Sequence, residues 1–163
     1  SHILASPAGI LSDARILINQ LRILAQQHRV TYDSPIDIES TIREISDIQQ
    51  QYTQHPGVRP FGVALIIAGK NQHETKLYTS DITGNYFEYN AVAIGENDNR
   101  IKEILRKKYR KDMKVDEAIK TAIGIFKEVL GEKFSADRIN VGYIKKDEER
   151  IVKLNGEHLK KFL

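Results

Sequence analysis

Cysteine and tryptophan are absent from the 163-residue sequence, and methionine occurs once. Without cysteine the chain can form no disulfide, no thiolate metal site and no cysteine nucleophile. The lack of cysteine fits a reducing compartment, so we expect a cytoplasmic location. The longest apolar run, Val63 to Ala68, is far shorter than the roughly 20 residues that span a bilayer. We therefore expect no membrane partner.

Motifs for catalysis and cofactor binding are missing as well. No glycine-rich phosphate-binding motif occurs, so no nucleotide cofactor is indicated. None of the histidines has a second histidine three or four residues away, which argues against a metal site; they are His2, His28, His55, His73 and His158. Ser1 could act as an N-terminal nucleophile with its own α-amine as base, but no nearby Lys or Asp suggests an assembled site. We expect no catalytic residue, metal or cofactor.

Charge is balanced overall, with a formal net charge of +3, and concentrates in one basic run, RKKYRKDMK at residues 106–114. Such a run could contact nucleic-acid phosphates. More often it is the solvated end of a helix, where cations complement the helix dipole. Tyr109 stands alone in this run, without the several aromatic side chains of a stacking platform. We therefore predict no nucleic-acid partner.

Four segments have helical periodicity. They cover about Leu11–His28, a stretch from Ser34 to Tyr52, Asn99–Tyr109 and Val115–Leu130. For the second helix we expect a capping box, with Ser34 as the N-cap, Pro35 at the first helical position and Asp37 closing the box. Gly131 is the expected cap after the last of these helices.

Strands are expected between and after these helices. Residues 61–69 are apolar at every position, which is typical of a strand buried on both faces. Its expected hairpin partner is Thr75–Ser80, with a loop at residues 71–73. Shorter strands are expected at Tyr86–Tyr89, Ala91–Ile94, Arg138–Ile144 and Ile151–Leu154, with a turn at residues 147–149 between the last two. A short helix is expected at Glu157–Leu163. Sequential rather than alternating elements predict a layered α+β fold, which we take as one domain over residues 1–163. The expected core includes Leu21, Val63, Leu65, Ile67, Ile119, Ala122 and Phe126.

Two blocks of sequence carry a resemblance to a known family. The first is Gly9 followed by Asp13-Ala14-Arg15 at the start of a helix, and the second is QYTQ at residues 51–54 followed by VRPFGV at 58–63. Within one helix Asp13 and Arg15 do not face each other, so by themselves they indicate only a favourable dipole contact and a solvated cation. In this order and spacing, with Gly95 before the third helix, the blocks resemble the α subunits of archaeal-type proteasome core particles. The signature residues are Asp13, Arg15, Tyr52, Arg59, Pro60, Phe61, Gly62 and Gly95.

The resemblance implies an αββα sandwich of the N-terminal-nucleophile hydrolase type. It also implies a non-catalytic subunit of a seven-membered homo-oligomeric α ring, stacked on β subunits that carry the catalytic threonine. Such a ring forms the substrate entry port and binds regulatory ATPase or cap complexes. Family members hold the C-terminal tails of these activators at the start of the first helix, which corresponds to Gly9 and Ile10.

The sequence departs from the family pattern in two respects. A gating segment, a helix and several strands precede the Gly9 motif in the family, so we expect an N-terminally truncated version of the fold. Gly95 is followed by Glu96-Asn97-Asp98 rather than by a Gly-x-Gly motif. Two alternatives stay open: a stand-alone interaction protein that kept the fold, and a catalytic β-type peptidase subunit. The second would need an N-terminal threonine with its lysine, and neither is present in matching context.

Overall fold

The computed structural model describes residues 2–71, 74–145, 148 and 150–162. By its internal contacts the chain divides into two compact units, one over residues 2–89 and one over the described residues from 90 onward. The single domain expected over residues 1–163 stays a prediction. Within the described part of the chain, none of the helices has the length and apolar character needed to cross a membrane.

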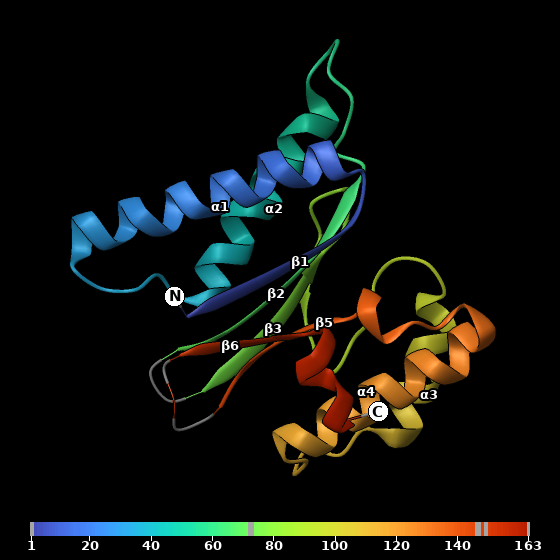
Figure 1. Cartoon of the computed structure of the whole chain (residues 1–163). Coiled ribbons are helices and arrows are strands. Elements are labelled where there is room, and N and C mark those ends of the chain that lie inside the picture. The colour runs from blue at the N-terminus through green and yellow to red at the C-terminus, as the bar shows by residue number, and fades with distance from the viewer. Residues whose placement is uncertain (1, 72–73, 146–147, 149, 163) are drawn as a thin grey trace. The chain divides into compact units, whose positions relative to one another are not determined.

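The first unit is a four-stranded antiparallel sheet with two helices. Its strands are β1 (Ile3–Gly9), β2 (Val63–Lys70), β3 (Thr75–Ser80) and β4 (Tyr86–Glu88), hydrogen-bonded in that order. Helices α1 (Leu11–Tyr32) and α2 (Ile38–Gln54) follow β1 in the chain and lie on the same side of the sheet (Figure 1).

The core of this unit lies between the sheet and the two helices. Alternate residues of β2 are fully buried, and they meet the apolar stripes of both helices. This buried set includes Leu17, Leu21, Ile38, Ile42, Ile45, Val63, Leu65, Ile67 and Tyr78. The prediction that Leu21, Val63, Leu65 and Ile67 are core residues is confirmed.

Two local predictions for this unit were wrong. Helix α2 begins at Ile38 rather than near Ser34, because the Asp37 carboxylate accepts the Ser40 amide at 2.8 Å and is the N-cap. Strand β1 was not predicted at all. It contains Pro7, which has no N–H to donate, and β1 is an edge strand, the position where a sheet tolerates proline. The loop predicted over residues 71–73 lies partly outside the described residues.

The second unit contains α3 (Asp98–Lys108), α4 (Val115–Leu130) and an antiparallel pair, β5 (Asn140–Ile144) with β6 (Ile151–Asn155). Short 3-10 helices cover Gly131–Lys133, Ala136–Arg138 and Gly156–Phe162. Helix α4 ends at Leu130 and Gly131 is its C-cap, as predicted, with the Gly131 amide donating to the Lys127 carbonyl. The turn predicted over residues 147–149 lies mostly outside the described residues. The strand predicted at Ala91–Ile94 does not form.

The buried face of α4 differs from the prediction. Ile119 is buried, as expected, and it packs with Ile123, Leu159 and Phe162. Ala122 is exposed, however, and the Phe126 side chain is 39% exposed, so the prediction that both are core residues was wrong. The apolar stripe of α4 is wider than the surface that covers it, and periodicity alone does not say which part of a wide stripe meets a partner.

Both units therefore combine helices with antiparallel strands, and the predicted α+β class is confirmed.

Candidate functional site

The junction between β1 and α1 brings together most of the residues that the sequence singled out. Gly9 ends β1, and Ile10 is the N-cap residue of α1, with no side-chain hydrogen bond to cap the helix. The Ile10 amide donates to the carbonyl of Gly62 at 2.9 Å, which fastens the start of α1 to the segment that leads into β2. The next side chain, Leu11, is 78% exposed. The first turn of α1 therefore presents backbone N–H groups beside exposed apolar side chains.

Asp13 is the buried centre of this junction. Its carboxylate accepts two hydrogen bonds from the Arg59 guanidinium, at 2.7 and 2.8 Å, and a third from the Gly62 amide at 2.8 Å. Asp13 is buried, whereas the Arg59 side chain is mostly exposed. The two parallel N–H···O bonds form the bidentate geometry that a planar guanidinium makes with a carboxylate. The pair links the first turn of α1 to the segment before β2.

These contacts shift the acid–base equilibria of both side chains. The hydrogen bonds from Arg59, followed by the bond from the Gly62 amide, lower the pKa of Asp13 from 3.8 to about 2. The same contact raises the pKa of Arg59. Asp13 is therefore an anion over the whole physiological pH range, and it is unsuited to act as a general base.

Two glycines make room for close contacts at the junction, Gly9 with backbone and Gly62 with the Ile10 side chain. A Cβ atom on Gly9 would lie 2.2 Å from the carbonyl oxygen of Gly62, and the φ of Gly9 is +131°. A Cβ atom on Gly62 would lie 2.5 Å from the Cδ1 atom of Ile10. Any larger residue at Gly9 would collide with backbone, so the glycine is required by the fold of this turn.

The remaining signature residues divide between the junction and elsewhere. Phe61 is buried, and its ring packs on Tyr52 of α2 with the centroids 4.4 Å apart. Pro60 is exposed in the same segment, and its carbonyl accepts a further bond from Arg59 at 3.0 Å.

Arg15 is exposed on α1 and is not part of the cluster around Asp13. Gly95 belongs to the second unit, where its carbonyl accepts a hydrogen bond from the Asp98 amide. The sequence correctly excluded an Asp13–Arg15 pair but did not predict the pair with Arg59.

Replacing Asp13 with asparagine is expected to destabilise the chain in a pH-dependent way. The folded-state pKa of Asp13 lies below its ordinary value, so the ionised carboxylate adds stability above pH of about 4, and that stability is lost as the pH falls through about 2. The melting temperature of Asp13→Asn should therefore lie below that of the wild type at pH 7, and the difference should shrink as the pH falls. Asp47→Asn, at an exposed position of α2, is the matched control. A difference that stays constant down to pH of about 2 would contradict the role of the charge.

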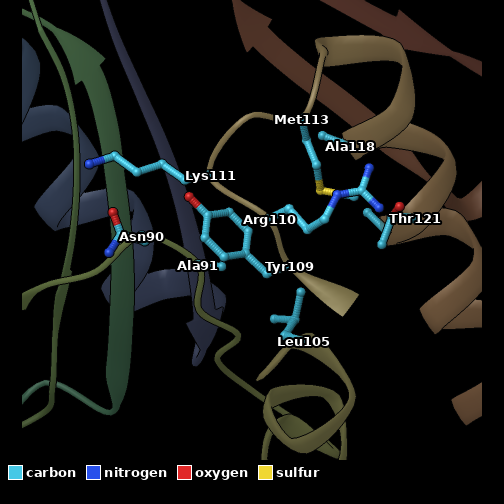
Figure 2. Close-up of a pocket in the computed structure, with 10 residues that line it drawn as sticks. Asn90, Ala91, Leu105, Tyr109, Arg110, Lys111, Met113, Ala118 and Thr121 are labelled. Atoms are coloured by element: carbon cyan, nitrogen blue, oxygen red, sulfur yellow. The ribbon is translucent and has the colours of Figure 1, made fainter. Parts of the chain in front are cut away.

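A hollow of about 280 Å³ occupies another part of the chain, between α3 and α4. Figure 2 shows that its lining comes from α3 and the loop after it, from α4 and from the start of the second unit. Arg110 and Lys111 point in opposite directions. Its lining residues are Asn90, Ala91, Leu105, Tyr109, Arg110, Lys111, Met113, Ala118, Thr121 and Ala122. None of these is a carboxylate, a histidine or a cysteine. The hollow therefore lacks the groups that most often serve as catalytic bases or metal ligands.

The basic run around this hollow is partly neutralised. Arg110 pairs with Glu117 and lies near Asp112, and the Lys108 ammonium lies 2.8 Å from Glu128. We expect the chain to show no binding to single- or double-stranded nucleic acid at physiological ionic strength, because these pairs reduce the charge available to phosphates. Fluorescence anisotropy with labelled oligonucleotides over a salt series measures this. Tight binding that weakens steeply with salt, and that is lost in Lys107→Glu/Lys111→Glu, would show the prediction to be wrong.

Metal binding has no support in the described part of the chain. No group of three or more His, Cys, Asp or Glu side chains lies there in an arrangement that could hold a metal ion.

Comparison with known proteins identifies similar sequences over nearly the whole chain. A family model described as proteasome subunit matches residues 1–144. A protein named proteasome subunit alpha from Pyrococcus abyssi is 44% identical over 162 residues, which are 99% of this chain and 62% of the relative. Proteins of the same name from Archaeoglobus fulgidus and Pyrobaculum aerophilum are 40% and 41% identical over 99% of this chain, and 65% and 66% of their own lengths are covered. The chain thus spans less than two thirds of the length of these relatives.

Proposed function

Because this chain belongs to the proteasome subunit family, we propose that it acts as an α-type ring subunit of a proteasome core particle, with a structural and substrate-entry role in protein degradation. Family membership confirms the predicted resemblance and agrees with an α+β fold of the N-terminal-nucleophile hydrolase type. The relatives are named as alpha subunits, and the proposal transfers that role to this chain.

The observation that carries the proposal is the junction between β1 and α1. The two sequence blocks that define the resemblance lie more than forty residues apart in the chain, and they meet through the Asp13–Arg59 pair and the Asp13–Gly62 bond. These hydrogen bonds hold the first turn of α1 against the segment that leads into β2. The cluster around Asp13 contains no nucleophile paired with a base, which favours a docking role over a catalytic one.

The partners in this proposal are other copies of the chain in a seven-membered ring, β subunits, and a regulatory ATPase or cap complex, in the cytoplasm. We assign the activator tail to Gly9 and Ile10 at the start of α1. A helix N-terminus offers free N–H groups and the positive end of the helix dipole, which together suit a terminal carboxylate. Arg59 adds a mostly exposed cation that belongs to the same cluster.

Tail binding can be tested without disturbing the fold. Leu11→Glu places a negative charge in the first turn of α1 at a side chain that is largely exposed, and an acidic residue at this position favours the helix itself. A peptide ending in hydrophobic-Tyr-x should bind Leu11→Glu at least about tenfold more weakly than Leu11→Gln, a difference of roughly 1.4 kcal/mol. Titrations on the assembled ring measure it. Equal affinity for the two variants would show that the tail does not bind at the start of α1.

Assembly tests the wider proposal. Co-expression with an archaeal β subunit should yield a ring-sized particle that contains both chains, measured by native mass spectrometry. A small oligomer that ignores the β subunit would instead indicate a stand-alone interaction protein with the same fold.

The chain alone is expected to hydrolyse no fluorogenic peptide, because the junction around Asp13 offers no nucleophile paired with a base. The assay is run on purified protein, with the co-expressed particle as the positive control. Turnover by the chain alone that is abolished by Ser1→Ala would establish a peptidase subunit and overturn the proposal.

A further inference from the structure

Three polar side chains of the first unit are almost completely buried, and each leaves one oxygen without a hydrogen-bond partner among the described residues. They are Ser46 and Gln49 of α2 and Ser80 of β3, with exposed fractions of 0 to 2%. The unpartnered atoms are Ser46 Oγ, Gln49 Oε1 and Ser80 Oγ. Buried hydroxyl and amide groups in folded proteins are nearly always hydrogen-bonded, to protein or to ordered water, so three such oxygens in one unit need an explanation.

The three side chains belong to the same interface between α2 and the sheet. Ser46 and Gln49 are three residues apart in α2 and therefore project from one face of the helix. The amide nitrogen of Gln49 donates to the Val63 carbonyl at 2.9 Å, which places the end of this side chain at the beginning of β2. Both α2 residues thus face the sheet.

Ser80 lies in β3, on the face of the sheet that meets α2. It is paired with Leu65 of β2, and directly opposite residues of neighbouring strands point to the same face of a sheet. Leu65 belongs to the core beneath the helices, so Ser80 also faces them. The turn after β3 lies against α2. Gly84 in this turn is so close to the helix that a Cβ atom there would lie 2.5 Å from the Ser46 carbonyl oxygen.

The three oxygens are neutral hydrogen-bonding groups, and this indicates a neutral ligand that can both donate and accept hydrogen bonds. Gln49 Oε1 only accepts hydrogen bonds, whereas each serine hydroxyl can both donate and accept. All three groups are neutral, so they provide no negative charge to offset the desolvation of a bound cation. A water molecule is neutral, offers two donors and two acceptors, and typically makes about three hydrogen bonds when buried.

We propose that Ser46, Gln49 and Ser80 together bind an internal water molecule that joins α2 to β2 and β3. The water donates to Gln49 Oε1 and to one serine oxygen, and it accepts the hydroxyl proton of the other serine, so that every orphaned oxygen gains a partner. Gln49 holds the first residue of β2, directly after Gly62, so this water supports the strand end on which the junction is built. All three residues belong to the first unit, so the proposal does not rest on assembly into a ring.

Whether Ser80→Ala raises or lowers the melting temperature tests the proposal. If the Ser80 hydroxyl is buried without a partner, Ser80→Ala removes an unsatisfied group and should raise the melting temperature. If it binds the internal water, the same change removes one of the ligands of the water and should lower the melting temperature by about 2–4 °C. Ser6→Ala is the matched control, since Ser6 is an exposed serine in a strand of the same sheet. A melting temperature for Ser80→Ala equal to or above that of Ser6→Ala overturns the proposal.

Crystallography gives an independent answer on the unaltered chain. The expected map shows one ordered water within hydrogen-bond distance of Ser46, Gln49 and Ser80, and the Ser46→Ala/Ser80→Ala variant loses it while the backbone keeps its path. A map in which these three side chains bond directly to protein groups, with no water between them, overturns the proposal.

Discussion

Leu65→Ala should lower the free energy of unfolding by about 2–5 kcal/mol, the range for a fully buried leucine. Leu65 of β2 is 0% exposed, and it packs in the cluster formed by α1, α2 and the sheet. Its removal would leave a cavity between three elements that are each fixed by their own hydrogen bonds. Such a site relaxes only partly, which places the cost toward the upper part of the range.

The matched control is Phe126→Ala in α4. The Phe126 side chain keeps 39% of its surface exposed, so its truncation should cost clearly less than the roughly 3–5 kcal/mol typical of a buried phenylalanine. Urea or guanidinium unfolding curves of the two variants give the comparison. A larger loss for Phe126→Ala than for Leu65→Ala would mean that the two side chains are buried in the opposite order.

Gly9→Ala should be the most damaging single-methyl change in the first unit. The new Cβ atom would stand 2.2 Å from the Gly62 carbonyl oxygen, which accepts the Ile10 amide, so relief of the collision must break that bond or move β2. The backbone angle adds a second penalty, since a φ of +131° is rarely adopted by residues other than glycine. Together the collision and the strain should cost roughly 2–5 kcal/mol.

Gly57→Ala separates these two penalties. Gly57 also has a positive φ, of +80°, but a Cβ atom there would meet nothing within 4 Å. Its replacement should therefore cost only the backbone strain, about 1–2 kcal/mol. Thermal melts of both variants, followed by far-UV circular dichroism, measure the difference. Similar melting temperatures would show that the β1–α1 turn opens easily and does not depend on close contact between backbones.

The site was only partly accessible to sequence reasoning, and the reason is the separation of its parts along the chain. The pattern predicted that Asp13 does not pair with Arg15, because residues two apart on a helix point away from each other. No periodicity relates Asp13 to Arg59, which lies 46 residues further on. That pair depends on the turn at Gly9 and on the path of the chain from α2 into β2. The hydrogen bonds that lower the pKa of Asp13 come from the same path.

By itself the sequence determined the α+β class, the presence of the four long helices and the strand at β2. These are local properties, set by the spacing of apolar residues and by caps such as Gly131. It also carried the family resemblance, which rests on the residue types and their order along the chain.

Tertiary structure decided the rest. The expectation that β2 is buried on both faces was not met, because only its alternate residues are buried and the others are half-buried. Strand β1, with Pro7 in its middle, has little strand character of its own and is held in place by its pairing with β2. Helix α4 has more apolar surface than its partners cover, so the position of those partners, and not the stripe itself, left Phe126 half exposed and buried Ile123. Local periodicity shows that a face is apolar, but only the packing of distant segments determines which side chains on that face lose contact with water.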